Sequence, residues 1–282
     1  MTDKISFDYN PFTPFNLFKW AIYFLLMLNV YIFFKEDSAA SAVLFPQGLK
    51  LANVIVGYAA SIDTAAWVLL ILLFELETYI LPDELIVGRT KLWMHTLRIV
   101  AYVVIIYSFY GYVEAYFALS AFIIVDPMSL CALVDGVNTF MVMQDEYALL
   151  TVENCASISQ SDILYAHARE AIFADANTYA EAHGLNLIDV INSATWLLIC
   201  FVLEVDVRLE LKGMLEGKKA LYSKITKLFL YSVLLVCAIF WGINGKFIDF
   251  WDAFLWILAF AAIEMNMFQW HREDAITESN EA

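Results

Sequence analysis

The sequence predicts an all-α integral membrane protein, a polytopic helical bundle. Hydrophobic residues make up 62% of the 282 positions and charged residues only 17%, whereas soluble domains are roughly 45–50% apolar and about 25% charged. Several apolar runs approach the roughly 20 residues that a helix needs to cross a bilayer. The expected surroundings are therefore the lipid bilayer of the cell (inner) membrane, and nucleic acid is not an expected partner.

The second observation is an internal repeat. Trp67, an apolar run and Glu75 recur as Trp196, a second apolar run and Glu204, at a constant offset of 129 residues. Other matches at this offset pair Gly88 with Gly217, Arg89 with Lys218, Arg98 with Lys227, and Tyr102 with Tyr231. Charges in apolar runs are the residues that a membrane segment tolerates least. Their joint recurrence therefore indicates a duplicated membrane unit.

The first three spans follow from hydropathy. Residues 17–34 form the first apolar run, and residues 62–81 form the second, which stops at Pro82. Proline cannot continue a helix without losing a backbone hydrogen bond. Residues 92–112 form the third run after a short basic loop. The second copy is expected to supply corresponding helices.

A fourth and a fifth span complete the predicted fold. Residues 113–125 are short for a span, but they match the more apolar segment at 251–263 with an offset of 138. Residues 128–143 echo the end of the first span. The prediction is eight transmembrane helices, arranged as two tandem parallel four-helix repeats at 1–126 and 127–282.

An alternative treats residues 113–143 as a re-entrant hairpin that enters from outside, which leaves six full spans. Thiol chemistry separates the two arrangements. A Cys131 that is bonded to Cys155 would exclude the eight-span arrangement, because the two cysteines would then lie on the same side. The four cysteines have no CxxC spacing, so the sequence predicts neither a disulfide framework nor a zinc motif.

Charge placement predicts the orientation. If the amino terminus is cytoplasmic, 12 of the 16 Lys and Arg residues lie on or near the cytoplasmic side, as the positive-inside rule requires. Residues 144–189 hold eight acidic residues and the single Arg169, and they are predicted to form an acidic extracytoplasmic cap. An even number of spans places both termini in the cytoplasm.

Two intramembrane ion pairs are the first candidate sites. Glu75 lies seven residues before Pro82, which is roughly 10 Å at 1.5 Å per residue, and Arg98 enters the next helix at a similar depth. Glu204 and Lys227 repeat this arrangement. The pairs are interpreted either as structural links between helices or as carboxylates that exchange protons or bind cations.

Asp135 and Asn138 are the other candidates. Both belong to the predicted fifth span, which they make unusually polar for contact with lipid. They are expected to face the bundle interior or a water-filled path. Hydrogen bonding to a neighbouring helix is the structural interpretation of the same two residues.

The predicted function is that of a secondary transporter or channel for a small cation or proton, with its site between the repeats. The alternative is a non-transporting accessory subunit that docks a membrane-protein partner, or a homo-oligomer. Nucleotide-binding, zinc-protease and serine-hydrolase motifs are absent from the sequence, so no enzyme activity, cofactor or metal site is predicted.

Overall fold

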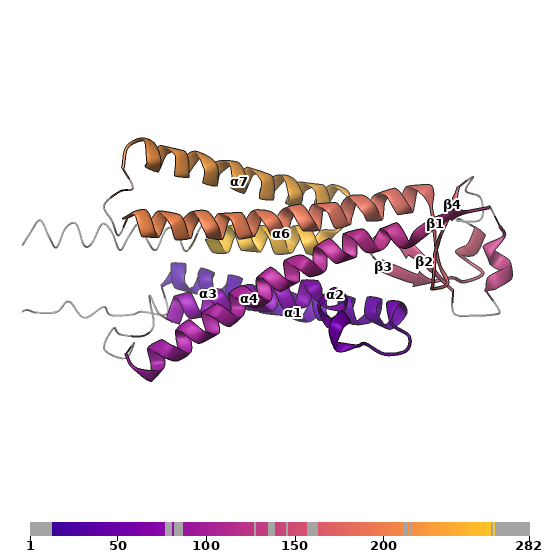
Figure 1. Cartoon of the computed structure of the whole chain (residues 1–282), viewed down its shortest axis with the longest axis horizontal. Coiled ribbons are helices and arrows are strands. Elements are labelled where there is room, and N and C mark those ends of the chain that lie inside the picture. Colours follow the sequence, from indigo (N-terminus) through magenta and orange to yellow (C-terminus); the bar gives the residue numbers. More distant parts are fainter. Residues whose placement is uncertain are drawn as a thin grey trace, which may run out of the picture.

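The computed structural model describes residues 13–76, 81, 87–126, 128–134, 139–144, 146–156, 163–210, 214, 216–260 and 262. Long helices lie side by side along the molecule, and a small β-sheet stands at one end of them (Figure 1). The protein is therefore mostly helical but not all-α. The prediction of an all-α fold is wrong in this respect.

The helices form two groups, which we call the first half and the second half. The first half comprises α1 (Pro14–Leu44), α2 (Val54–Gly57), α3 (Ala59–Glu75) and α4 (Arg89–Ala118), with a 3-10 turn at Leu51–Asn53. The second half comprises α6 (Ala176–Glu210), α7 (Lys218–Ile243) and a helical segment at 247–260, here called the final helix. α4 and α6 join the halves by direct contact.

Four helices in the described part of the chain are long and apolar enough to cross a membrane. They are Pro14–Leu44, Arg89–Ala121, Ala176–Asp206 and Lys218–Ile243. α3, with 17 described residues, and the final helix pack in the same core, where Trp67 and Trp256 are both buried. These findings are consistent with a location in a membrane.

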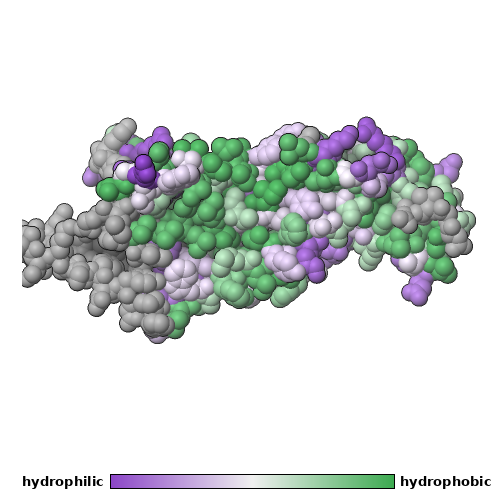
Figure 2. Space-filling view, turned by 90° about the horizontal axis from the view of Figure 1, so that it is seen from below, coloured by the Kyte–Doolittle hydropathy of each residue, from purple (hydrophilic) through white to green (hydrophobic). Residues whose placement is uncertain are grey.

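The outer surface of the helices is apolar. Large hydrophobic side chains are exposed along both α4 and α7, among them Ile99, Val103, Leu228 and Val236. The face in Figure 2 shows hydrophobic side chains over the middle of the bundle, with hydrophilic ones gathered toward its ends. Exposed apolar surface this continuous is not tolerated by a monomer in water, and it matches contact with lipid tails.

The sheet is built from the residues between α4 and α6. Its five described strands are β1 (Phe122–Val125), β2 (Phe140–Met143), β3 (Glu146–Leu149), β4 (Leu164–His167) and β5 (Ile172–Asp175). Their order is β1-β4-β5-β2-β3, and only the β2–β5 pairing is parallel. One face packs on the helices through Leu119 and Ala182. The predicted boundary at 126/127 falls inside this sheet.

A disulfide joins Cys131 to Cys155 within the sheet region. Cys131 lies in a 3-10 turn at Leu130–Leu133, and Cys155 follows β3. The bond excludes the eight-span arrangement, which would have separated the two cysteines. The cysteine spacing in the sequence did not predict this disulfide.

The predicted fourth and fifth spans are therefore not transmembrane helices. Residues 113–118 are the last turns of α4, and β1 follows at Phe122–Val125. The second segment contains a 3-10 turn and then β2. The re-entrant hairpin is wrong for the same reason, since these strands pair within the sheet. Short runs of β-branched and aromatic residues can form either a strand or a helix. In this protein they form strands because they pair with other strands of the sheet.

Candidate functional site

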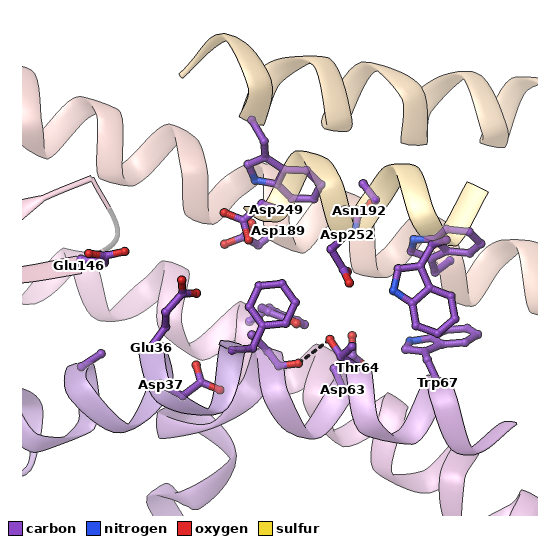
Figure 3. A pocket seen from close by; sticks show the side chains of 18 residues that line it. Glu36, Asp37, Asp63, Thr64, Trp67, Glu146, Asp189, Asn192, Asp249 and Asp252 are labelled. Carbon is purple, nitrogen blue, oxygen red and sulfur yellow. Dashed lines mark hydrogen bonds between the residues drawn. The ribbon is translucent and has the colours of Figure 1, made fainter. Parts of the chain in front are cut away.

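A cavity with a volume of about 170 Å³ lies between the two halves. α1 and α3 form one wall, α6 and the final helix form the other, and single residues of α4, α7 and β3 complete it. Glu146 of β3 is one of the lining residues, so the cavity lies in the part of the bundle next to the sheet (Figure 3).

Acidic side chains dominate this cavity. Its described lining includes the seven carboxylates of Glu36, Asp37, Asp63, Glu146, Asp189, Asp249 and Asp252. None of its 18 described lining residues is Lys, Arg or His. When the charges that line a cleft all have the same sign and its walls have a low dielectric constant, the electrostatic potential inside the cleft is strengthened. The acidic cavity therefore attracts cations, although Glu146 is already paired with Lys246 at 3.4 Å.

Hydrogen bonds fix two of these carboxylates. Asp37 Oδ2 accepts from the Ser61 backbone N–H at 2.9 Å and from the Ser61 hydroxyl at 2.7 Å. Asp252 Oδ1 accepts from Asn29 Nδ2 at 2.7 Å, which links the final helix to α1. Both carboxylates are thus oriented before any ligand arrives.

Asp63 is positioned differently. Only 9% of the residue is exposed, and its carboxylate lies beside the side chains of Trp67 and Tyr112. Its Oδ1 has no hydrogen-bond partner among the described residues, and neither has Oδ1 of Asn192 across the cavity. Buried polar atoms are nearly always paired. These two acceptors therefore need a donor that the described protein residues do not provide.

Aromatic rings close the inner end of the cavity. Trp67 packs against Trp196 with ring centroids 5.9 Å apart and against Trp256 at 6.2 Å. Phe260 packs against Trp196 in a tilted arrangement, with ring centroids 4.7 Å apart. We call these four residues the aromatic layer. It joins the two halves at the level where Trp67 and Trp196, the repeated tryptophans, meet.

Glu75 lies on α3 beyond the aromatic layer, roughly 12 Å from Trp67 along the helix axis. It forms an ion pair with Lys19 of α1 and accepts a hydrogen bond from Tyr23 at 3.2 Å. The exposed fractions are 0% for the Lys19 side chain and 1% for that of Glu75. This buried cluster is separate from the acidic cavity.

The described ion pairs join other residues than the predicted ones. Glu75 pairs with Lys19 of α1, whereas Arg98 is half-buried on α4. Lys227 pairs at 2.8 Å with Asp206, and the exposed Glu204 pairs with Arg208 on its own helix.

None of these predicted site residues lines the acidic cavity. Asp135 and Asn138 lie outside the described residues. Sequence reasoning therefore missed the cavity, although one signal for it was present. Asp63 with Asn192, and Tyr112 with Trp241, each have the spacing of 129 residues, and all four line the cavity.

No protein-family model, curated protein or solved structure matches this chain, so the function must be argued from the cavity itself.

Proposed function

We propose that the protein is a membrane transporter that takes a small cation into the acidic cavity from the extracytoplasmic side. The observation that carries this proposal is the concentration of carboxylates, with no basic residue in the described lining, between helices of membrane-spanning length. Ionisable residues in a membrane bundle normally mark an ion or substrate path when they face its interior.

Two features support this orientation. The disulfide lies in the sheet region, and disulfides persist in oxidising compartments. Arg89 and Lys91 lie at the start of α4, and Lys218 and Lys219 at the start of α7, at the end opposite the sheet. By the positive-inside rule that end is cytoplasmic. In this orientation the cavity opens on the outer side, and both termini are cytoplasmic.

The closed inner end favours a carrier over an open channel. The aromatic layer and then the Lys19–Glu75 pair follow the cavity along α3, so a cation could pass only after the helices rearranged. Duplicated halves that rock against each other are a common carrier design. Gly88 (φ 56°, ψ −119°) and Gly217 (φ 54°, ψ −120°) precede α4 and α7 with matching backbone angles. This match supports the duplication that we propose.

The test is cation flux into proteoliposomes that contain the purified protein, with gradients of Na⁺, K⁺, protons and the organic dication of 1,4-diaminobutane applied in turn. Asp63→Asn and Asp252→Asn keep the side-chain size and remove one charge each. Both should lower flux by about tenfold or more, the equivalent of roughly 1.4 kcal/mol. Glu204→Gln is the matched control, because Glu204 is 59% exposed and outside the cavity; its flux should be unchanged.

Absence of flux for every cation, in native protein that is folded and inserted, would contradict the transport proposal. The accessory-subunit alternative would then be favoured by the sheet, whose edge strand β1 exposes Ile123 and Ile124. Exposed apolar residues on an edge strand are suited to pairing with another chain. Co-purification that Ile124→Lys abolishes would identify this surface as the docking site.

A further inference from the structure

The acidic cavity differs between its two ends. At its inner end the Asp252 carboxylate projects toward Asp63 and Thr64, next to the aromatic layer (Figure 3). Toward the sheet, five further carboxylates line the walls, namely Glu36, Asp37, Glu146, Asp189 and Asp249. Negative charge is therefore spread along the cavity instead of meeting at one point.

This spacing does not suit a bare metal ion. Among the residues that the structure describes, no group of three His, Cys, Asp or Glu side chains is arranged to hold one. Ca²⁺ requires 6–8 oxygen ligands, and Mg²⁺ requires an octahedral set at about 2.1 Å. The volume of about 170 Å³ is also several times the roughly 30 Å³ share of one water molecule. The cavity fits a larger cation with several charges.

The orphaned acceptors specify the chemistry of that cation. Oδ1 of Asp63 and Oδ1 of Asn192 each lack a donor among the described residues. A primary ammonium group carries three N–H donors and can donate to either of these oxygens. A quaternary ammonium has no N–H and cannot satisfy either.

The aromatic layer supplies the apolar part of the site. Trp67, Trp196 and Trp256 all line the cavity beside Asp63. Tryptophan faces attract cations, with about 0.5–2 kcal/mol per contact, and they also bury methylene groups favourably. An aliphatic chain that carries an ammonium group matches both properties.

We infer that the substrate is a linear aliphatic amine with two or more primary ammonium groups, a short diamine or polyamine. One ammonium lies between Asp63, Asn192 and Asp252, the methylene chain lies along the tryptophans, and a second ammonium reaches the outer carboxylates. This inference rests on the proposed cation transport and narrows its substrate class.

Binding to the purified protein in detergent is the direct test, measured by calorimetry and by tryptophan fluorescence at constant ionic strength. The probes are 1,4-diaminobutane, n-butylamine with the same chain and one charge, and tetramethylammonium with no N–H. The diamine should bind at least about tenfold more tightly than n-butylamine. Tetramethylammonium should bind more weakly than either.

Variants then locate the two ammonium groups. Asp63→Asn should weaken both amines by about tenfold, whereas Glu204→Gln should leave them unchanged. Asp37→Asn should weaken the diamine toward the affinity of n-butylamine and leave n-butylamine itself unaffected. This outer variant keeps the test decisive if Asp63→Asn fails to fold.

Each opposite result overturns a defined step. Equal affinity for n-butylamine and the diamine would refute the second ammonium, and tight binding of tetramethylammonium would refute the N–H requirement. Flux of Na⁺ or K⁺ that depends on Asp63, without amine binding, would overturn this inference and leave the proposed function standing. Absence of both flux and amine binding would overturn both.

Discussion

Lys19 on α1 and Glu75 on α3 form an ion pair inside the bundle, with 0% and 1% of their side chains exposed. The two residues lie 56 positions apart in the sequence, and both of their charged groups are buried. Tyr23, one turn along α1 from Lys19, donates to the same carboxylate. The pair holds α1 against α3 beyond the inner end of the acidic cavity.

Replacing only one residue of this ion pair should lower the stability of the protein. Lys19→Met leaves the Glu75 carboxylate buried without its cation, and such a change destabilises a protein by about 3–5 kcal/mol. The double variant Lys19→Met with Glu75→Gln removes both charges and should recover much of this loss. Thermal unfolding in detergent measures the order of stabilities. A double variant that is less stable than Lys19→Met would contradict the charge-burial argument.

Asp206 should matter more for stability than its neighbour Glu204. Asp206 is 11% exposed by its side chain and binds Lys227 at 2.8 Å and the Ser223 hydroxyl. Asp206→Asn should therefore destabilise by roughly 1–2 kcal/mol, as expected for a hydrogen bond to a charged group. Glu204→Gln should change stability by less than about 0.5 kcal/mol, since it disturbs only an exposed i,i+4 pair. Equal losses in unfolding experiments would argue against this assignment.

Gly111 and Gly184 form a matched pair for testing helix contact. A Cβ at Gly111 would lie 2.8 Å from the Ile55 carbonyl oxygen, so α4 and α2 would have to separate. Gly111→Ala should destabilise by about 1–3 kcal/mol, the usual range for overpacking. A Cβ at Gly184 would make only an ordinary contact, 3.7 Å from Phe240.

Gly184→Ala should accordingly be neutral or stabilising by up to about 1 kcal/mol, because alanine reduces the entropy of the unfolded chain. Both variants are compared with the native protein by thermal unfolding. The packing argument fails if Gly111→Ala is as stable as Gly184→Ala.

The disulfide predicts the number of cysteine thiols that react with a labelling reagent. Denatured, unreduced protein should react with maleimide at two thiols, those of Cys200 and Cys237, and reduced protein at four. Cys155→Ser should cost about 3 kcal/mol, from the chain-entropy model for a loop closed over 24 residues. Mass spectrometry after labelling provides the count. Four reactive thiols without reductant, in protein isolated from its membrane, would show that the bond does not form.

Composition was sufficient to predict a helical membrane protein, because a surface that faces lipid must be apolar whatever the fold. Composition could not predict the β-sheet. Phe122–Val125 and Phe140–Met143 are four-residue apolar runs, and hydropathy does not distinguish such a run from part of a helix. Their identity depends on partners far along the chain, such as β4 for β1.

The sequence predicted the type of site, carboxylates within the helices, but not the residues that form it. The repeat pattern pointed to Glu75, which is buried, and to Glu204, which is exposed, because depth along a helix does not determine the direction in which a side chain points. Lys19 was not among the predicted site residues, so its pairing with Glu75 was missed. Asp252 was not among them either, although it lines the cavity and accepts a hydrogen bond from Asn29. Both errors concern packing between helices, which no local pattern encodes.

The sheet has a mechanical consequence for the two halves. α4 leads through a 3-10 turn, Leu119–Ala121, directly into β1, and β5 leads directly into α6. Both junctions therefore end in one hydrogen-bonded sheet. The sheet thus holds together the last turn of α4, from the first half, and the first turn of α6, from the second half, independently of the contacts between the helices.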